Sequence, residues 1–159
     1  MRGRKPTASS TPPRDRALAL LARREHSERE LRRKLVGRGV EADDAKAVVD
    51  ELAATELVDD GRFAHSLVRR RSEAGYGPRH IAAELATHGI RGDDARDALA
   101  EVDFEPIARR ILARRLGSGT PDAAARARAA QFLMRRGFPG DLVSRLTRVG
   151  GLDDDPADA

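Results

Sequence analysis

The sequence predicts an all-α protein made of three tandem three-helix repeats that form an elongated, curved array. Alanine and leucine, with 27 and 16 copies, supply most of the apolar residues, whereas only five residues are aromatic. Alanine and leucine favour helices, and the scarcity of aromatic and β-branched residues disfavours sheets. Capping residues and glycines also divide residues 14–149 into nine segments with helical spacing of apolar residues, and the pattern occurs three times.

Each helix is expected to start at a capping residue or at a proline in the first turn. Ser27 and Glu30 have the spacing of a capping box, in which the serine hydroxyl accepts a backbone amide and the glutamate bonds back. Gly77-Pro78 places a proline at the first helical position, where its missing N–H costs nothing. The nine expected starts are Asp15, Ser27, Asp43, Asp59 or Asp60, Gly77-Pro78, Asp93, Asp103, Thr120-Pro121 and Phe138-Pro139.

The three repeats share a motif of two apolar residues four positions apart, then a glycine, then another apolar residue. Units this small bury little apolar surface alone, so neighbouring units should stack. The expected repeats are 14–56, 57–102 and 103–149, and the alternative is one irregular nine-helix globule with chance glycine spacing. The motif occurs as Leu31, Leu35, Gly39 and Val40, as Ile81, Leu85, Gly89 and Ile90, and as Ala129, Leu133, Gly137 and Phe138.

Charge alternates along the chain, although the formal total is only +4. Residues 1–40 hold 12 basic and four acidic side chains, whereas residues 41–61 hold one basic and eight acidic ones. Alternation of this kind agrees with a repeated unit that has a basic and an acidic part. The ends, a basic tail at 1–13 and an acidic tail at 150–159, contain too little apolar surface to order themselves and are expected to be disordered.

The residue inventory argues against most enzymes and against membrane proteins. The absence of cysteine excludes disulfides and thiolate sites, and no apolar run approaches the roughly 20 residues that cross a bilayer. The first residues lack the apolar segment of a secretory signal. The sequence contains no phosphate-binding loop and no metal-binding histidine spacing, and the paired aspartates are expected to cap helices. We therefore expect a cytoplasmic protein that is not an enzyme and has no cofactor or metal.

Basic residues recur in clusters that coincide with expected helix ends. In a last turn they favour the helix dipole by about 0.3–1 kcal/mol each, which is a purely structural role. If several clusters shared one surface, they would instead suit a polyanion, because phosphate contacts release counterions. The candidate binding residues are Arg32, Arg33 and Lys34, Arg69, Arg70 and Arg71, Arg79, Arg109 and Arg110, and Arg114 and Arg115, with a further pair at Arg135-Arg136.

Tyr76 is the only tyrosine, and it lies between Gly75 and Gly77. Its flat ring with a polar end suits an interface or stacking on a base. Alternatively, the ring packs over the start of the following helix as a hydrophobic staple. Both interpretations stay open at this level, and Tyr76 is included among the candidate binding residues.

Several sequence runs resemble those of the RecX family of bacterial recombinase regulators. They are ALALLARREHS at 17–27, ELRRKL at 30–35, LVDDGRFA at 57–64 and GYGPRHI at 75–81, followed by Glu84-Leu85 and Gly89-Ile90. The resemblance covers nearly all of 14–149. It is weakest in the third repeat, where Ala129 occupies the position of Leu31 and Ile81.

The resemblance implies a monomeric regulator that binds the RecA recombinase filament on single-stranded or duplex DNA. Such a protein lowers the ATPase, strand-exchange and SOS co-protease activities of RecA, and weaker binding to naked DNA is compatible with it. The alternative is an independent helical module that binds duplex DNA. The expected helices at 41–53 and 92–101 are acidic, which is unfavourable for recognition in a major groove.

Overall fold

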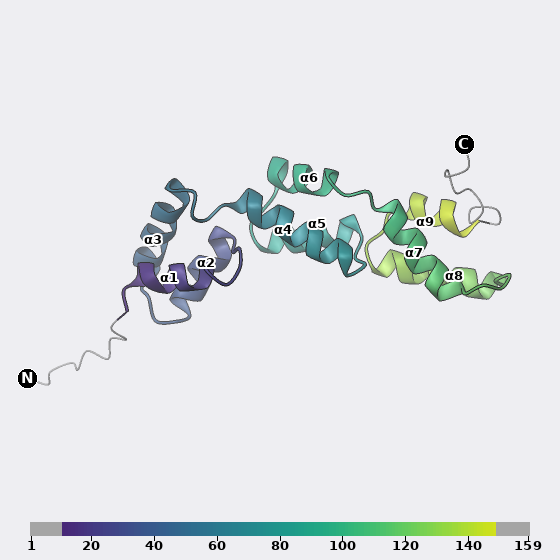
Figure 1. Ribbon diagram of the computed structural model, residues 1–159, viewed down its shortest axis with the longest axis horizontal. Helices are drawn as coiled ribbons and strands as arrows, with labels where there is room; N and C mark the ends of the chain where they lie inside the picture. Colours follow the sequence, from purple (N-terminus) through teal and green to yellow (C-terminus); the bar gives the residue numbers. More distant parts are fainter. Residues whose placement is uncertain (1–10, 149–159) are drawn as a thin grey trace, which may run out of the picture. The chain divides into compact units, whose positions relative to one another are not determined.

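The computed structural model describes residues 11–148, and within that range it contains nine α-helices and no strand (Figure 1). The expected tails at 1–13 and 150–159 lie mostly outside the described residues, and the first helix already begins at the last residue of the expected N-terminal tail. The helices are α1 Pro13–Leu21, α2 Glu28–Val36, α3 Ala42–Ala54, α4 Asp60–Glu73, α5 Pro78–Thr87, α6 Gly92–Ala100, α7 Glu105–Leu116, α8 Ala123–Arg135 and α9 Gly140–Thr147.

Most helix starts lie within two residues of the expected positions, but several of the expected caps are wrong. Asp15, Asp43 and Asp93 lie inside the first turns of α1, α3 and α6, where a carboxylate favours the helix dipole without capping an amide. The Ser27 hydroxyl accepts the Glu30 amide at 3.1 Å, and Pro78 is the first residue of α5. The expectation that Thr120-Pro121 begins a helix is wrong, because α8 begins at Ala123. There the carboxylate of Asp122 accepts the Ala125 amide at 2.6 Å, and a carboxylate at the N-cap is as effective as a hydroxyl.

The shared glycine of each repeat ends its second helix in the same conformation. Gly39, Gly89 and Gly137 have φ values of 83°, 85° and 88°, in the left-handed region that glycine adopts without strain. The amide after each glycine bonds to the carbonyl five residues earlier, at 3.0–3.1 Å: Val40 to Leu35, Ile90 to Leu85, and Phe138 to Leu133. The third repeat therefore shares the register of the other two despite its alanine at 129.

Three separate hydrophobic clusters form the core, one for each group of three helices. The first is formed by α1–α3 and the loop after them, the second by α4–α6, and the third by α7–α9. Leu35, Leu85 and Leu133, which occupy equivalent motif positions, are each 0% exposed. The prediction of an all-α chain with three three-helix domains is confirmed.

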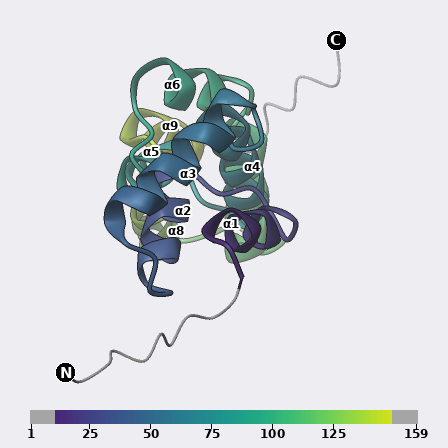
Figure 2. The same ribbon diagram turned by 90° about the vertical axis from the view of Figure 1, so that its left-hand side faces the viewer.

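The chain divides into two compact units, Met1–Asp60 and Gly61–Ala159. The first unit contains α1, α2 and α3, which pack against one another (Figure 2). The second unit contains the other two hydrophobic clusters, and Phe104 packs against both of them. Contacts between the second and third repeats thus belong to one unit.

Candidate functional site

The second unit holds a joint in which the turn after α4 meets the turn after α8. The Gly77 amide donates to the Arg136 carbonyl at 2.7 Å, and the Arg79 amide donates to the Gly137 carbonyl at 3.0 Å. The Arg136 guanidinium also donates to the Ala74 carbonyl at 3.3 Å. Three hydrogen bonds therefore connect residues that lie about 60 positions apart in the chain.

Two glycines allow the backbones to approach this closely. A Cβ atom at Gly77 would lie 2.5 Å from the Gly137 carbonyl carbon, and one at Gly137 would lie 2.4 Å from the His80 amide nitrogen. Atoms this close overlap, and the obstacle is backbone rather than a flexible side chain. Glycine at 77 and 137 is therefore a steric requirement of the joint between the repeats.

Around the joint, rings and guanidinium groups form a continuous chain of contacts, which we term the arginine–aromatic stack. The Tyr76 ring stacks on His80 with centroids 4.4 Å apart, and the Arg136 guanidinium lies 4.5 Å from the Tyr76 centroid. Arg136 also lies 5.1 Å from the Phe132 centroid, and Arg115 lies 3.6 Å over the same ring. Each cation–π contact contributes about 0.5–2 kcal/mol, depending on exposure.

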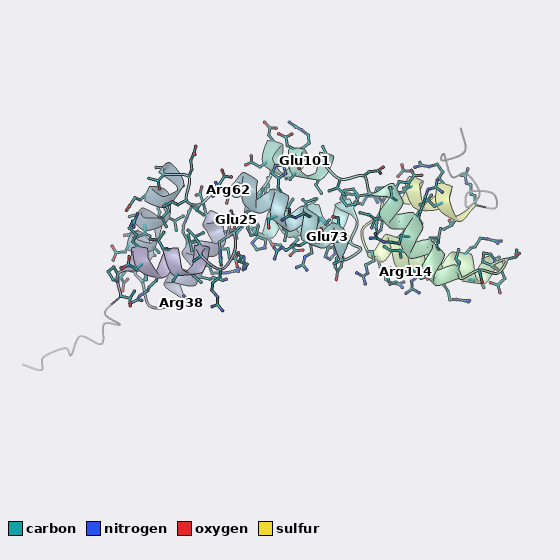
Figure 3. All side chains as sticks on the ribbon, viewed as in Figure 1. Glu25, Arg38, Arg62, Glu73, Glu101 and Arg114 are labelled. Atoms are coloured by element: carbon teal, nitrogen blue, oxygen red, sulfur yellow. The ribbon has the colours of Figure 1, made fainter. Side chains whose placement is uncertain are left out.

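A pocket of about 220 Å³ lies beside the stack. Its apolar part is formed by Ala74, Gly75, Ile111 and the Phe132 ring, which come from the end of α4, from α7 and from α8. Its polar part consists of the three guanidinium groups of Arg114, Arg115 and Arg136. Figure 3 shows Glu73 at the end of α4 and Arg114 on α7, the elements that approach each other here.

The pocket carries an unbalanced positive charge, since no carboxylate lines it. Arg114 and Arg115 are exposed, and within residues 11–148 neither forms an ion pair. Arg136 is half-buried and directs its hydrogen bond to a neutral carbonyl. An anionic group that enters this pocket would meet three cations and no competing acid.

The other candidate residues of the second unit differ in whether a carboxylate neutralises their positive charge. Arg71 forms a bidentate pair with Glu84 of α5, at 2.7 and 2.6 Å, and this hydrogen bonding lowers the pKa of Glu84. Arg109 directs two donors, Nε and Nη2, to one oxygen of Glu105, and Arg145 donates to the other oxygen of that carboxylate. Among these candidates, the exposed side chains without an ion pair within residues 11–148 are Arg69, Arg70, Arg79, Arg110 and Arg135.

In the first unit, the predicted cluster on α2 is largely engaged within its own domain. Arg32 pairs with Glu28 at 2.8 Å, and Lys34 pairs with the buried Glu30 at 3.1 Å. Burial alone would raise the pKa of Glu30, but hydrogen bonds from Arg24 and Lys34 outweigh it and lower that pKa to about 2. Of the three predicted residues, only Arg33 is exposed, and the other two are half-buried.

The Lys34 ammonium also lies 2.9 Å from Nε2 of His26, whose Nδ1 lies 2.9 Å from the Arg24 carbonyl. Since Lys34 can only donate, Nε2 accepts and Nδ1 carries the proton. Burial lowers the pKa of His26, in agreement with a neutral ring between two cations. This network connects the loop before α2 to the helix. It also engages the Glu30 carboxylate, which the capping-box pattern had predicted to bond to the backbone at the start of α2.

Sequence reasoning missed two residues of the stack, Phe132 and His80. Phe132 lies between the buried Ala129 and Leu133 on α8 but off their face, and it is half-buried. A large aromatic residue outside the apolar face of a helix was the signal that could have found it. The Tyr76 ring contacts His80 in the first turn of α5, so it packs over the helix start as one of the two interpretations proposed.

No helix within residues 11–148 is long and apolar enough to cross a membrane. Over the same residues, no three His, Asp or Glu side chains are grouped so that they could hold a metal ion.

Comparison with protein families gives three matches in chain order. Residues 14–52 match the first three-helix domain of RecX, residues 59–99 the second, and residues 105–146 the third. Together they cover most of the chain, and each contains three of the observed helices or most of their length.

Individual relatives agree with these matches. The chain is 47% identical over 149 residues to regulatory protein RecX of Stenotrophomonas maltophilia strain R551-3, covering 92% of this chain and 91% of the relative. It is 49% identical over 139 residues to regulatory protein RecX of Xanthomonas campestris pv. campestris strain B100, covering 86% of each.

Two solved structures share the fold. The crystal structure of a regulatory protein RecX superposes with a TM-score of 0.73 at 22% identity, covering 83% of this chain and 68% of that one. The crystal structure of RecX from Lactobacillus salivarius gives a TM-score of 0.71 at 23% identity, covering 83% and 90%.

Proposed function

The chain belongs to the RecX family of regulatory proteins, and from that premise we propose that it binds the RecA recombinase filament on DNA and inhibits it. Inhibition would lower ATP hydrolysis, strand exchange and the SOS co-protease activity of RecA. In this role the protein acts in the cytoplasm, as a monomer and by binding rather than by catalysis. The observation that carries the proposal is the match of all three RecX domains in order.

The charge distribution of the second unit supports the proposal. The exposed Arg69 and Arg70 at the end of α4, and Arg110, Arg114 and Arg115 on α7, form no ion pair among the described residues. Cations without a carboxylate partner lose little when they bind phosphate, because no internal pair has to break. By contrast, Arg71 and Arg109 already neutralise glutamates and are poorly suited to a first contact.

The acidic helices argue against the alternative of an independent duplex-binding module. The third helix of each of the first two repeats begins with an exposed aspartate pair, Asp43-Asp44 in α3 and Asp93-Asp94 in α6. An acidic first turn repels phosphates, whereas a recognition helix presents that end to the major groove.

The proposal is tested with RecA filaments preassembled on single-stranded DNA. We expect the protein to co-sediment with the filament and to reduce ATP turnover at sub-equimolar ratios to RecA. Unchanged turnover without co-sedimentation would refute the proposal. Tight, sequence-selective binding to naked duplex DNA, without an effect on RecA, would support the alternative module.

A further inference from the structure

We infer that the pocket beside the arginine–aromatic stack binds one nucleotide of single-stranded DNA, with the base against Phe132 and Ile111 and the phosphate at Arg114 and Arg115. The inference rests on the proposed function only in placing DNA near this protein. It adds a defined subsite that the basic clusters alone do not specify.

The chemistry of the lining matches the two parts of a nucleotide. A phosphate needs cationic hydrogen-bond donors, and the Arg114 and Arg115 guanidinium groups provide them without a neighbouring carboxylate. A base needs a flat surface on which to stack. In this pocket the Arg115 guanidinium covers the Phe132 ring at 3.6 Å, and this guanidinium–ring pair, beside the Ile111 side chain, provides that surface. Proteins that bind single strands combine these two features.

The stack also orients the cations that a base would meet. Arg115 lies 3.6 Å over Phe132, and Arg136 is held between two rings and the Ala74 carbonyl. A guanidinium held against a ring loses little freedom on binding and is itself a planar group on which bases stack. The joint at Gly77 and Gly137 places Ala74 and Gly75, which line the pocket from the second repeat, against α7 and α8 of the third repeat.

The size of the pocket limits its occupant. A volume of about 220 Å³ is below the range of about 300–1,000 Å³ for sites that enclose whole drug-sized ligands. It suits a single base, whose sugar and phosphate remain at the exposed rim where Arg114 and Arg115 lie. A duplex presents its bases stacked and paired, so a single strand is the form that can place a base there.

The test compares two oligonucleotides of equal length and charge, without recombinase. One is oligothymidylate, and the other carries abasic sites at every position of its central half. Fluorescence anisotropy measures the affinity of each for the full-length protein. We expect the wild-type protein to bind the thymine strand about tenfold more tightly, since each stacked base contributes substantially to affinity. Equal affinities for the two strands would overturn the inference.

Variants test whether the preference for the thymine strand over the abasic strand arises in this pocket. Phe132→Leu retains an apolar side chain but removes the ring, so we expect the tenfold difference to shrink to about twofold. Phe104→Leu makes the same change in the same unit, outside the pocket, and should retain the full difference. Arg114→Gln should reduce the salt slope of binding by about 0.7. A difference that persists in Phe132→Leu would overturn the inference.

Photocrosslinking gives a second measurement that does not depend on variants. A strand with one 5-iododeoxyuridine should crosslink to the tryptic peptide 129–135, in which Phe132 is the only aromatic residue. Crosslinks confined to peptide 72–79, which contains Tyr76, would overturn the proposed position of the base.

Competition experiments distinguish binding of a nucleic-acid strand from binding of any other anion. Polyglutamate of equal charge should compete at least tenfold less well than the thymine strand, and equal competition would overturn the preference for a nucleotide. Thymidine monophosphate should compete only weakly, because it lacks the neighbouring phosphates, and strong competition would overturn the assignment to a strand. None of these measurements uses RecA, so a negative outcome here leaves the filament proposal to its own test.

Discussion

The Gly77 amide donates a 2.7 Å hydrogen bond to the carbonyl oxygen of Arg136, and this bond joins the second repeat to the third. The same contact places the side chain of Arg136 between the rings of Tyr76 and Phe132. Together with the Arg79–Gly137 and Arg136–Ala74 bonds, this bond forms the joint between two repeats at the same place as the candidate binding site.

Replacing Gly137 by alanine should destabilise the second unit more than an equivalent change in the first. Gly39 and Gly137 have similar φ values, 83° and 88°, but a Cβ at Gly39 meets nothing within 4 Å, whereas one at Gly137 meets the His80 backbone. Gly39→Ala should cost only the left-handed strain of about 1–2 kcal/mol. Gly137→Ala should cost more and disturb the stack. Urea unfolding of both variants checks this, and equal costs would contradict it.

Leu85→Ala should lower the free energy of unfolding by about 2–5 kcal/mol, because the side chain is completely buried. Leu35→Ala and Leu133→Ala, at the equivalent buried positions, should have effects of the same size. Leu57→Ala is the matched control, since that leucine is 45% exposed and should change stability by well under half as much. Chemical denaturation of the four variants measures this, and a negligible effect at Leu85 would contradict the packing.

The first unit should lose stability in acid through Glu30. The folded pKa of about 2 lies below the usual value of 4.5, so the stabilisation is complete above about pH 4.5 and is lost as pH falls toward 2. Burial would raise this pKa, but the Arg24 and Lys34 hydrogen bonds prevail. Because Arg24 is 40% exposed, the effect is on the order of 2 kcal/mol rather than the full value of the shift.

His26 should act in the same direction at higher pH. Burial lowers its pKa below 6.5, so its contribution is complete above pH 6.5 and is lost as the pH falls through the lowered folded pKa. Hydrogen exchange of α2 peptides between pH 7 and pH 3, with exchange rates corrected for pH, measures the local loss of stability from His26 and from Glu30. Glu30→Gln should weaken protection at pH 7 and flatten the loss at lower pH, and a variant with wild-type pH dependence would refute this role of Glu30.

Charge reversal should separate the neighbouring arginines of α4. Arg69→Glu with Arg70→Glu should weaken filament binding and reduce its salt slope by about 0.7 for each lost contact with a single-strand phosphate. The melting temperature should fall only slightly, through the lost helix-dipole interaction of Arg70 in the last turn of α4. Arg71→Glu should lower the melting temperature more, because Glu84 then faces a like charge instead of its bidentate partner. Sedimentation at several salt concentrations and thermal unfolding provide the two measurements. Equal melting temperatures for both changes would contradict this separation.

The sequence by itself determined the features that depend on neighbours along the chain. Helical periodicity, the Ser27 cap and the glycine that ends the second helix of each repeat are all local, so nine helices in three domains could be predicted for the described part of the chain. The start of α8 was missed because Thr120, followed by Pro121, and Asp122 are both suitable N-cap residues. Only the backbone geometry shows that Asp122 is the cap.

Only the tertiary structure decided which charges are available and which residues meet across the repeats. Arg69 and Arg71 look alike in sequence, but a carboxylate on the facing helix engages only Arg71. Phe132 and Tyr76 lie 56 positions apart, and both contact Arg136. Hydrogen bonds between backbone atoms bring them together, and such bonds cannot be recognised from the types of the residues involved. The physical reason is that ion pairs and main-chain contacts depend on distances in space, which hydrophobic and capping patterns along the chain do not contain.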